Sequence, residues 1–166
     1  QKITGSTGQR LWGEQGKEVC VKTGLQDYPK AVIHHSGNLI TTWTDLETEP
    51  YNAMVQWFDS DGLPFWVDNG IYVGRDFSEA GLSDVYRSGS MMLNVWVGIK
   101  NAESAYGYYA QRIDIDGNFL WDTLGVLIEY VSMNYDKCSD GMDGAIVLFG
   151  NPGYLAVQRI DSTGQV

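Results

Sequence analysis

The sequence YYAQRIDIDGNFLW at residues 108–121 recurs along this chain. A second copy, AMVQWFDSDGLPFW, occupies residues 53–66, and a third, LAVQRIDSTGQV, occupies residues 155–166. The segment QKITGSTGQRLW at residues 1–12 is a fourth copy with one additional residue before its glycine. Every copy carries a glutamine at the same place, and three of them close on a tryptophan. Self-similarity at this period identifies a repeat protein.

An aspartate and a glycine define a turn inside three of the copies. An aspartate at the first position of a turn accepts a hydrogen bond from the backbone two residues on. A glycine three residues later supplies the positive φ that completes a type I turn with a bulge. We therefore expect two strands joined by a tight turn in each copy. The pairs are Asp59/Gly62, Asp114/Gly117 and Asp161/Gly164.

A second run of residues precedes each copy and predicts two further strands. It reads PKAVIHHSGNLITTWTD at residues 29–45, SGSMMLNVWVG at residues 88–98 and DGAIVLFG at residues 143–150. Four antiparallel strands with recurring aromatic residues, repeated every ~50 residues, are typical of a β-propeller blade. The sequence thus predicts an all-β, β-propeller-like fold of about three four-stranded antiparallel blades. A β-sandwich built of repeats is the alternative.

The repeats divide the chain into units of about residues 1–55, 56–110 and 111–157, followed by the start of a further unit. Three blades are fewer than the ring of about four to eight that closes a propeller. We therefore expect residues 1–166 to be one partial propeller domain, a fragment of a longer chain. Its expected partners are the remaining blades of that chain or a second copy that completes the ring.

Charge and hydropathy exclude two classes of partner. The 166 residues include 21 acidic and 11 basic side chains, which gives a formal charge of −10. Such a charge repels a phosphate backbone, so no nucleic acid partner is expected. The longest apolar run, residues 145–149, is far shorter than the ~20 residues of a membrane-spanning helix. No membrane insertion is expected.

The most complete unit carries QRIDIDG at residues 111–117, LW at 120–121, GV at 125–126, SDG at 139–141 and GAIV at 144–147. This pattern resembles the propeller-like repeats of large secreted and cell-surface proteins of Bacteroidetes-type bacteria, the cargo of type IX secretion. Those repeats have no assigned function. The resemblance implies an extracellular or cell-surface location, but no activity, because fold and function are separable.

The repeated side chains are expected to have structural roles. Buried amides must be satisfied, so the repeated glutamines are expected to bridge backbone groups between blades. The repeated tryptophans are expected to pack between blades. The third-strand residues Phe58, Ile113 and Ile160 are expected to lie on faces that need a neighbouring blade.

Few residues form a pattern typical of catalysis or metal binding. Paired carboxylates in the Asp-x-Asp-Gly turns could bind Ca²⁺, although no third acidic ligand follows Gly62 or Gly117 at the required spacing. The adjacent His34 and His35 point to opposite faces of a strand and cannot chelate one metal together. We therefore expect no cofactor, with calcium at the turns as the alternative, and no catalytic residues.

The candidate binding surface consists of the loops that follow the second and fourth strands of each blade, which share one face of a propeller. These segments vary most in length and sequence, as binding loops do. They combine carboxylates with non-repeated aromatic residues, which suits sugars because CH groups stack on rings and carboxylates accept hydrogen bonds from hydroxyl groups. A solvated acidic rim is the alternative. The candidate residues are Tyr28, Asp45, Glu47, Glu49, Tyr51, Asp76, Phe77, Glu79 and Tyr130.

These observations together predict a non-catalytic extracellular scaffold or adhesion module that binds a protein or a glycan through its loop face. A purely structural spacer or surface-assembly repeat is one alternative. Part of a propeller-type glycosidase is another, and it would require two carboxylates at a defined separation in one pocket.

Overall fold

The computed structural model describes residues 1–47, 50–101 and 104–166, and the regular structure of these residues is entirely β. The predicted all-β class is confirmed. None of the described residues belongs to a helix that could cross a lipid bilayer. The strands are β1 (Gln26–Ile33), β2 (Leu39–Asp45), β3 (Asn52–Phe58), β4 (Ile71–Tyr72), β5 (Phe77–Ser88), β6 (Met91–Lys100), β7 (Gly107–Ile113), β8 (Val126–Tyr130), β9 (Met133–Ser139), β10 (Ala145–Asn151) and β11 (Tyr154–Ile160).

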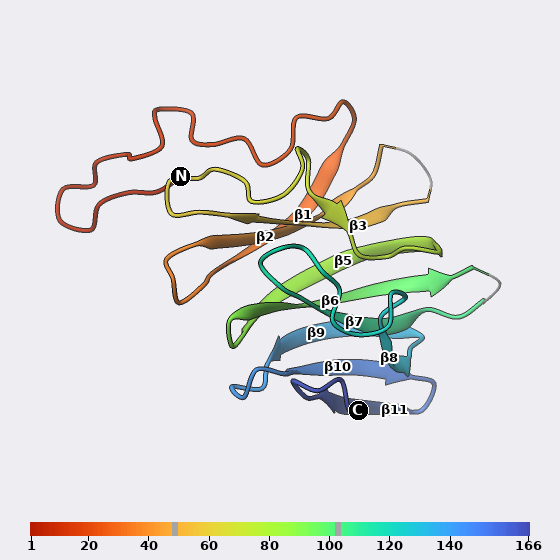
Figure 1. The fold of residues 1–166 in the computed structure, drawn as a ribbon. Helices are drawn as coiled ribbons and strands as arrows, with labels where there is room; N and C mark the ends of the chain where they lie inside the picture. Colours follow the sequence, from red (N-terminus) through yellow and green to blue (C-terminus); the bar gives the residue numbers. More distant parts are fainter. Residues whose placement is uncertain (48–49, 102–103) are drawn as a thin grey trace.

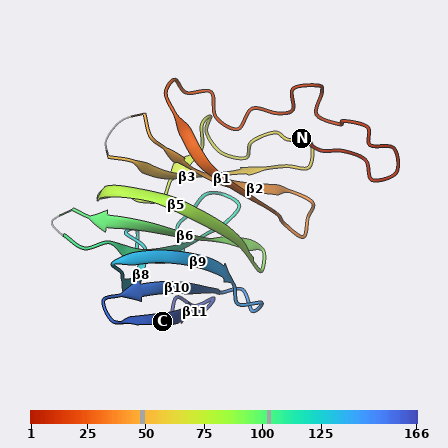
Figure 2. The ribbon, with the colours of Figure 1, turned by 180° about the vertical axis from the view of Figure 1, so that it is seen from behind.

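The strands form three antiparallel sheets that follow one another along the chain. Sheet 1 has the order β1-β2-β3-β4, and sheet 2 has the order β5-β6-β7-β8. Sheet 3 has the order β11-β10-β9, so the described residues supply it with three strands where the sequence predicts four. The sheets are stacked in chain order from the N-terminal to the C-terminal end in both views (Figures 1 and 2).

The fourth strand of a sheet begins later than the sequence predicts. The segment that leads to Trp66 makes only an isolated bridge, between Phe58 and Pro64. After the tryptophan, the N–H of Gly70 donates to the carbonyl oxygen of Val67 at 3.1 Å, and Gly70 has a φ of 74°. This turn redirects the chain, so that β4 follows it and pairs with β3. The same turn precedes β8 in sheet 2.

Residues 1–25, called the arm below, form no named strand, although residues 1–12 are a copy of the repeat. Ile3 and Arg10 form an isolated bridge in the arm. The arm extends along sheet 1 (Figure 1), where the N–H of Val21 donates to Oδ1 of Asn69 at 2.7 Å. The arm is attached to sheet 1 through side chains and single backbone groups. This copy of the repeat therefore forms no sheet.

Two apolar layers hold the stack together. The layer between sheets 1 and 2 contains the fully buried Val55 and Trp57 of sheet 1 and Trp96 of sheet 2. The layer between sheets 2 and 3 contains Tyr108 of sheet 2 and Val147 of sheet 3. Sheet 2 is therefore buried on both faces, which explains the nearly continuous apolar sequence of β6.

Each repeated tryptophan lies against the turn glycine of the following repeat. A Cβ atom on that glycine would lie 3.0–3.2 Å from the nearest indole atom, which is tighter than an ordinary van der Waals contact, so glycine lets the indole approach without displacement. The prediction that the tryptophans pack between repeats is confirmed. The contacts are Trp12 with Gly62, Trp66 with Gly117, and Trp121 with Gly164.

The repeated glutamines bond within their own repeat, so the prediction that they bridge neighbouring blades is wrong. Nε2 of Gln111 donates to the carbonyl oxygen of Asp122 at 2.6 Å, and its Oε1 accepts from the N–H of Trp121 at 3.1 Å. Nε2 of Gln56 donates in the same way to Val67, at 2.9 Å. The glutamine thereby ties the third strand to the residue that follows the tryptophan.

Candidate functional site

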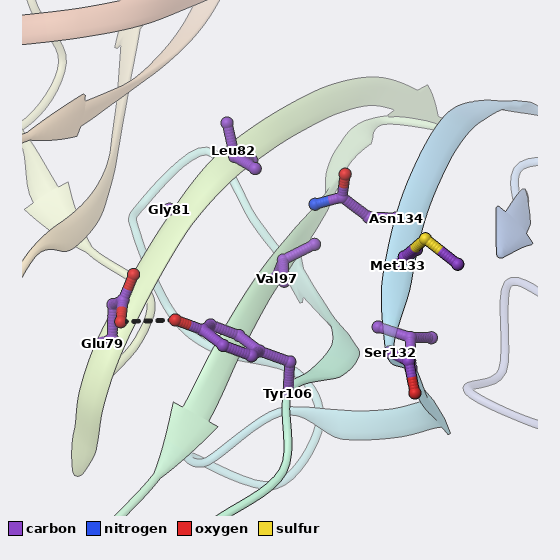
Figure 3. Close-up of a pocket in the computed structure, with 9 residues that line it drawn as sticks. Glu79, Gly81, Leu82, Val97, Tyr106, Ser132, Met133 and Asn134 are labelled. Carbon is purple, nitrogen blue, oxygen red and sulfur yellow. Dashed lines mark hydrogen bonds between the residues drawn. The ribbon is translucent and has the colours of Figure 1, made fainter. Parts of the chain in front are cut away.

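A groove of about 460 Å³ lies between sheets 2 and 3, at the end of the sheets where β6 leads into β7 (Figure 3). Strand β5 forms one wall, and the first residues of β9 form the other. Both are edge strands of their sheets. Among the residues that line the groove are Glu79 and Leu82 from β5, Tyr106 from the loop before β7, Ser132 directly before β9, and Met133 and Asn134 at the start of β9.

The wall formed by β9 is fixed to both neighbouring elements through the short link between β8 and β9. The N–H of Val131 donates to the carbonyl oxygen of Tyr106 at 2.8 Å. The N–H of Ser132 donates to Oδ1 of Asn151, the last residue of β10, at 2.9 Å. The link before β9 is therefore held by the loop before β7 and by the end of β10.

A hydrogen bond between Glu79 and Tyr106 is the main polar feature of the groove. The Tyr106 hydroxyl donates to Oε2 of Glu79 at 2.8 Å, and this bond raises the pKa of the Tyr106 phenol. Tyr106 is 40% exposed. The pair crosses one end of the groove, opposite Ser132 and Met133 (Figure 3). It places an aromatic surface beside a carboxylate, the combination that the sequence singles out for sugars.

The groove continues into a smaller pocket of about 210 Å³ that shares Leu82 and Asn134 with it. In the lining of this pocket, Nζ of Lys137 lies 2.8 Å from Oδ2 of Asp84 and donates to the carbonyl oxygen of Leu82 at 2.9 Å. The side chain of Lys137 is almost fully buried, so this ion pair joins sheets 2 and 3. Tyr28 of β1 also lines the smaller pocket.

Of the nine predicted binding residues, the structure therefore brings Glu79 into the groove and Tyr28 into the pocket beside it. Tyr51 and Tyr130 are both near this end of the sheets but do not line the groove. The carbonyl oxygen of Tyr51 accepts from the N–H of Ala80 at 2.8 Å, which ties the loop after β2 to sheet 2. Glu49 lies outside the described residues.

Asp45 and Glu47 hold the arm to sheet 1. Oδ2 of Asp45 lies 2.9 Å from Nζ of Lys22, and the Asp45 residue is only 6% exposed. Burial alone would raise the pKa of Asp45, but the hydrogen bonds from Lys22 and from the N–H of Glu47 outweigh it, and the pKa lies below its usual value. Glu47 in turn accepts a hydrogen bond from the Thr23 hydroxyl. Both carboxylates thus have partners within the chain.

The prediction that Phe77 is an aromatic residue of the loop face is wrong. Phe77 begins β5, is only 4% exposed, and packs edge-on against Trp96 and Tyr109 in the layer between sheets 1 and 2. Asp76, directly before it, is exposed and has a φ of 60°. This left-handed residue turns the chain, so the ring of Phe77 enters the core instead of facing solvent.

Tyr106 is a residue of the groove that the sequence interpretation missed although the repeat carries a signal for it. It stands five residues before the repeated Gln111, where Tyr51 stands relative to Gln56. Carrying the choice of Tyr51 forward by one repeat would have found it. No comparable signal marks Leu82, Met133 or Asn134, because their place in the groove depends on how sheet 3 packs against sheet 2.

The Asp-x-Asp-Gly turns have the predicted conformation. Oδ1 of Asp59 accepts from the N–H groups of Asp61 and Leu63, both at 2.9 Å, and Gly62 has a φ of 80°. The carboxylate of Asp114 makes the equivalent bonds in the next repeat. The first aspartate of each turn therefore closes the turn itself. The described residues contain no group of three or more His, Cys, Asp or Glu side chains placed to hold a metal ion.

Comparison with known proteins finds no matching family model, no similar curated protein and no similar solved structure. The resemblance to secreted bacterial repeats therefore rests on the residues that carry it.

Proposed function

We propose that this protein is a non-catalytic carbohydrate-binding module, and that the groove between sheets 2 and 3 holds the sugar. The Glu79–Tyr106 pair is the observation that carries this proposal. The exposed ring offers a surface for the CH groups of a sugar, and Glu79 has a second oxygen, Oε1, that accepts no hydrogen bond from the described residues. Ser132 and Asn134 supply further polar groups on the opposite wall.

The composition of the groove favours binding over hydrolysis. A glycosidase of the common type needs a pair of carboxylates on either side of the scissile bond. Glu79 is the single carboxylate among the described residues that line the groove. The carboxylates of Asp45 and Glu47 interact with the arm instead.

The same proposal includes an extracellular role as a scaffold or adhesion module, with the three sheets as blades of a propeller-like arc. The chain order of the sheets, the apolar layers between them and the repeated tryptophan–glycine contact support the arc. The resemblance of the repeat to secreted surface proteins supports the location.

A glycan array followed by titration of the best oligosaccharide tests the proposal. We expect the Glu79→Gln and Tyr106→Ala variants to bind at least about tenfold more weakly than the wild type, because each loses a direct contact. Glu14→Gln, which changes an exposed carboxylate on the arm, is the matched control and should bind normally. Absence of binding by the wild type, or equal loss in the control, would contradict the proposal and favour a spacer.

A further inference from the structure

The first strands of the three sheets share a β-bulge, an extra residue that interrupts the pairing with the second strand. The register shifts lie within residues 27–30 of β1, 81–84 of β5 and 134–136 of β9. Each shift lies opposite the aromatic residue that recurs in the second strand, namely Trp43, Trp96 or Phe149. Bulges bend a strand and re-aim its side chains, and they are frequent beside functional sites. The repeat therefore produces the same irregularity in each sheet.

The three bulges meet at the pocket of about 210 Å³ beside the groove, called the bulge pocket below. Each first strand lines this pocket with one residue of its bulge and with the residue two positions later. These residues are Tyr28 and Lys30 of β1, Leu82 and Asp84 of β5, and Asn134 and Asp136 of β9. The bulge pocket is thus assembled from equivalent positions of three consecutive sheets.

Two of the bulge residues hold a backbone conformation that is uncommon for bulky side chains. The φ of Tyr28 is 53°, and that of Leu82 is 47°. Bulky residues at positive φ are outliers, and residues in such conformations cluster at ligand-binding and active sites. Tyr28 is 49% exposed, and its hydroxyl has no hydrogen-bond partner among the described residues. The bulge of β1 therefore places an exposed aromatic side chain at the pocket.

The polar groups of the bulge pocket balance in charge. Asp84 is already paired, because its carboxylate lies 2.8 Å from Nζ of Lys137 and 3.8 Å from Nζ of Lys30. Oδ1 of Asp136 accepts from the N–H of Lys137 at 2.8 Å, and its Oδ2 accepts no hydrogen bond from the described residues. The amide of Asn134 likewise has no partner among them. Acceptors and donors for hydroxyl groups therefore stand beside the ring of Tyr28 without an excess of either charge.

The groove and the bulge pocket are continuous and together are longer than one sugar ring. Leu82 and Asn134 line both, and they lie at the end of the groove away from the Glu79–Tyr106 pair (Figure 3). From Glu79 to Asp84, β5 advances by about 15 Å at the usual rise of a strand. A ligand that fills both spaces therefore has more than one sugar unit.

We propose that the groove and the bulge pocket form one extended site for a linear, uncharged oligosaccharide of at least two sugar units. This inference rests on the proposed function, since the first unit occupies the groove at Tyr106 and Glu79. The second unit stacks on Tyr28 and forms hydrogen bonds with Asn134 and Asp136. The bulge pocket is lined by two lysines and two aspartates, and the groove adds the negative charge of Glu79, so an anionic sugar is disfavoured.

Calorimetric titration of the full chain with cello-, xylo-, malto- and manno-oligosaccharides from one to four units tests the extended site. We expect the wild type to bind the best of these series at least about tenfold more tightly at two or more units than as a single unit. Tyr28→Ala should lose this gain. Tyr72→Ala is the matched control and should keep it, because Tyr72 is 48% exposed but lines neither the groove nor the bulge pocket.

Glu79→Gln separates this inference from the proposed function. It changes the groove, so it should weaken single sugars and longer oligosaccharides by the same factor. If sugars bind in a Glu79-dependent way but further units add nothing, or if Tyr28→Ala keeps the gain, the extended site is wrong and the groove proposal stands. If the wild type binds no sugar of any length, both fail. Oligogalacturonate that binds as tightly as the best neutral series would overturn the preference for an uncharged ligand.

Discussion

The indole of Trp66 lies against Gly117 of the next repeat and donates from Nε1 to the carbonyl oxygen of Ile115 at 2.8 Å. A Cβ atom at Gly117 would lie 3.2 Å from Nε1, and the glycine has a φ of 86°. Trp66 follows β3 of sheet 1, and Gly117 closes the turn after β7 of sheet 2. One tryptophan and one glycine thus join consecutive repeats, and the chain uses this contact three times.

Replacing Gly117 by alanine should destabilise the protein through both the turn and the tryptophan contact. Gly153 is a matched control, because it has a φ of 93° but no atom within 4 Å of its Cβ position. The left-handed conformation costs about 1–2 kcal/mol for a residue with a Cβ atom. We expect Gly117→Ala to lose about 1 kcal/mol more than Gly153→Ala in urea unfolding. Equal losses would show that the indole moves aside without cost.

The repeated sequence predicts those contacts of the fold that use the same two residue types in every repeat. Tryptophan and glycine recur together because a residue without a Cβ atom lets the indole approach closely, so their common spacing along the chain indicates the contact between repeats. The first strands are predicted for a similar reason, since a Ser-Gly turn joins two apolar runs at β1 and β2.

The start of the fourth strand and the burial of Phe77 could not be predicted from the repeat. The side chain of Gln56 donates to the carbonyl oxygen of Val67, and β4 begins only after the turn at Gly70. Phe77 follows Gly74, Arg75 and Asp76, a composition that indicates a loop, yet its ring packs against Trp96. Both outcomes depend on contacts between segments that local sequence does not show.

For the same reason, the sequence predicts only one of the residues that line the groove. Glu79 could be chosen because it is a carboxylate in a variable segment, but its partner Tyr106 comes from a loop after the next strand. The other wall belongs to sheet 3. A site formed by two packed sheets is determined by their relative position, which no single repeat encodes.

The amide of Gln111 should contribute more to stability than its repeat counterpart Gln158. Gln111 is fully buried and bonds to backbone groups of Arg112, Trp121 and Asp122. Gln158 is half-buried, and its amide makes one long bond, 3.4 Å to the carbonyl oxygen of Arg159. Replacing Gln111 by leucine leaves buried backbone groups unsatisfied, and we expect a loss of about 2–4 kcal/mol in urea unfolding.

Gln158→Leu is the control for this prediction and should change the free energy of unfolding by less than about 0.5 kcal/mol. A comparable loss in both variants would indicate that leucine disturbs the strand itself. In that case the amide bonds of Gln111 would not account for its effect.

Protonation of Asp140 should destabilise the protein in acid. Burial alone would raise the pKa of this carboxyl group, but hydrogen bonds from the N–H of Met142, from Arg159 and from the N–H of Gly144 outweigh it. The pKa of Asp140 in the folded chain therefore lies below its ordinary value of 3.8. A group with a lowered pKa stabilises the fold above its unfolded pKa, and this contribution disappears as the pH falls through the folded pKa.

We therefore expect the midpoint of thermal unfolding to fall as the pH drops below about 4, and to fall less steeply in Asp140→Asn than in the wild type. Asp116→Asn is the matched control, because the Asp116 carboxylate accepts no hydrogen bond from the described residues, and it should keep the wild-type pH dependence. At pH 7 the Asp140→Asn variant should already be less stable, since Nε and Nη2 of Arg159 both lie 2.7 Å from Oδ2 of Asp140. An unchanged acid profile in Asp140→Asn would show that other carboxyl groups, such as those of Asp45 and Asp114, carry the pH dependence.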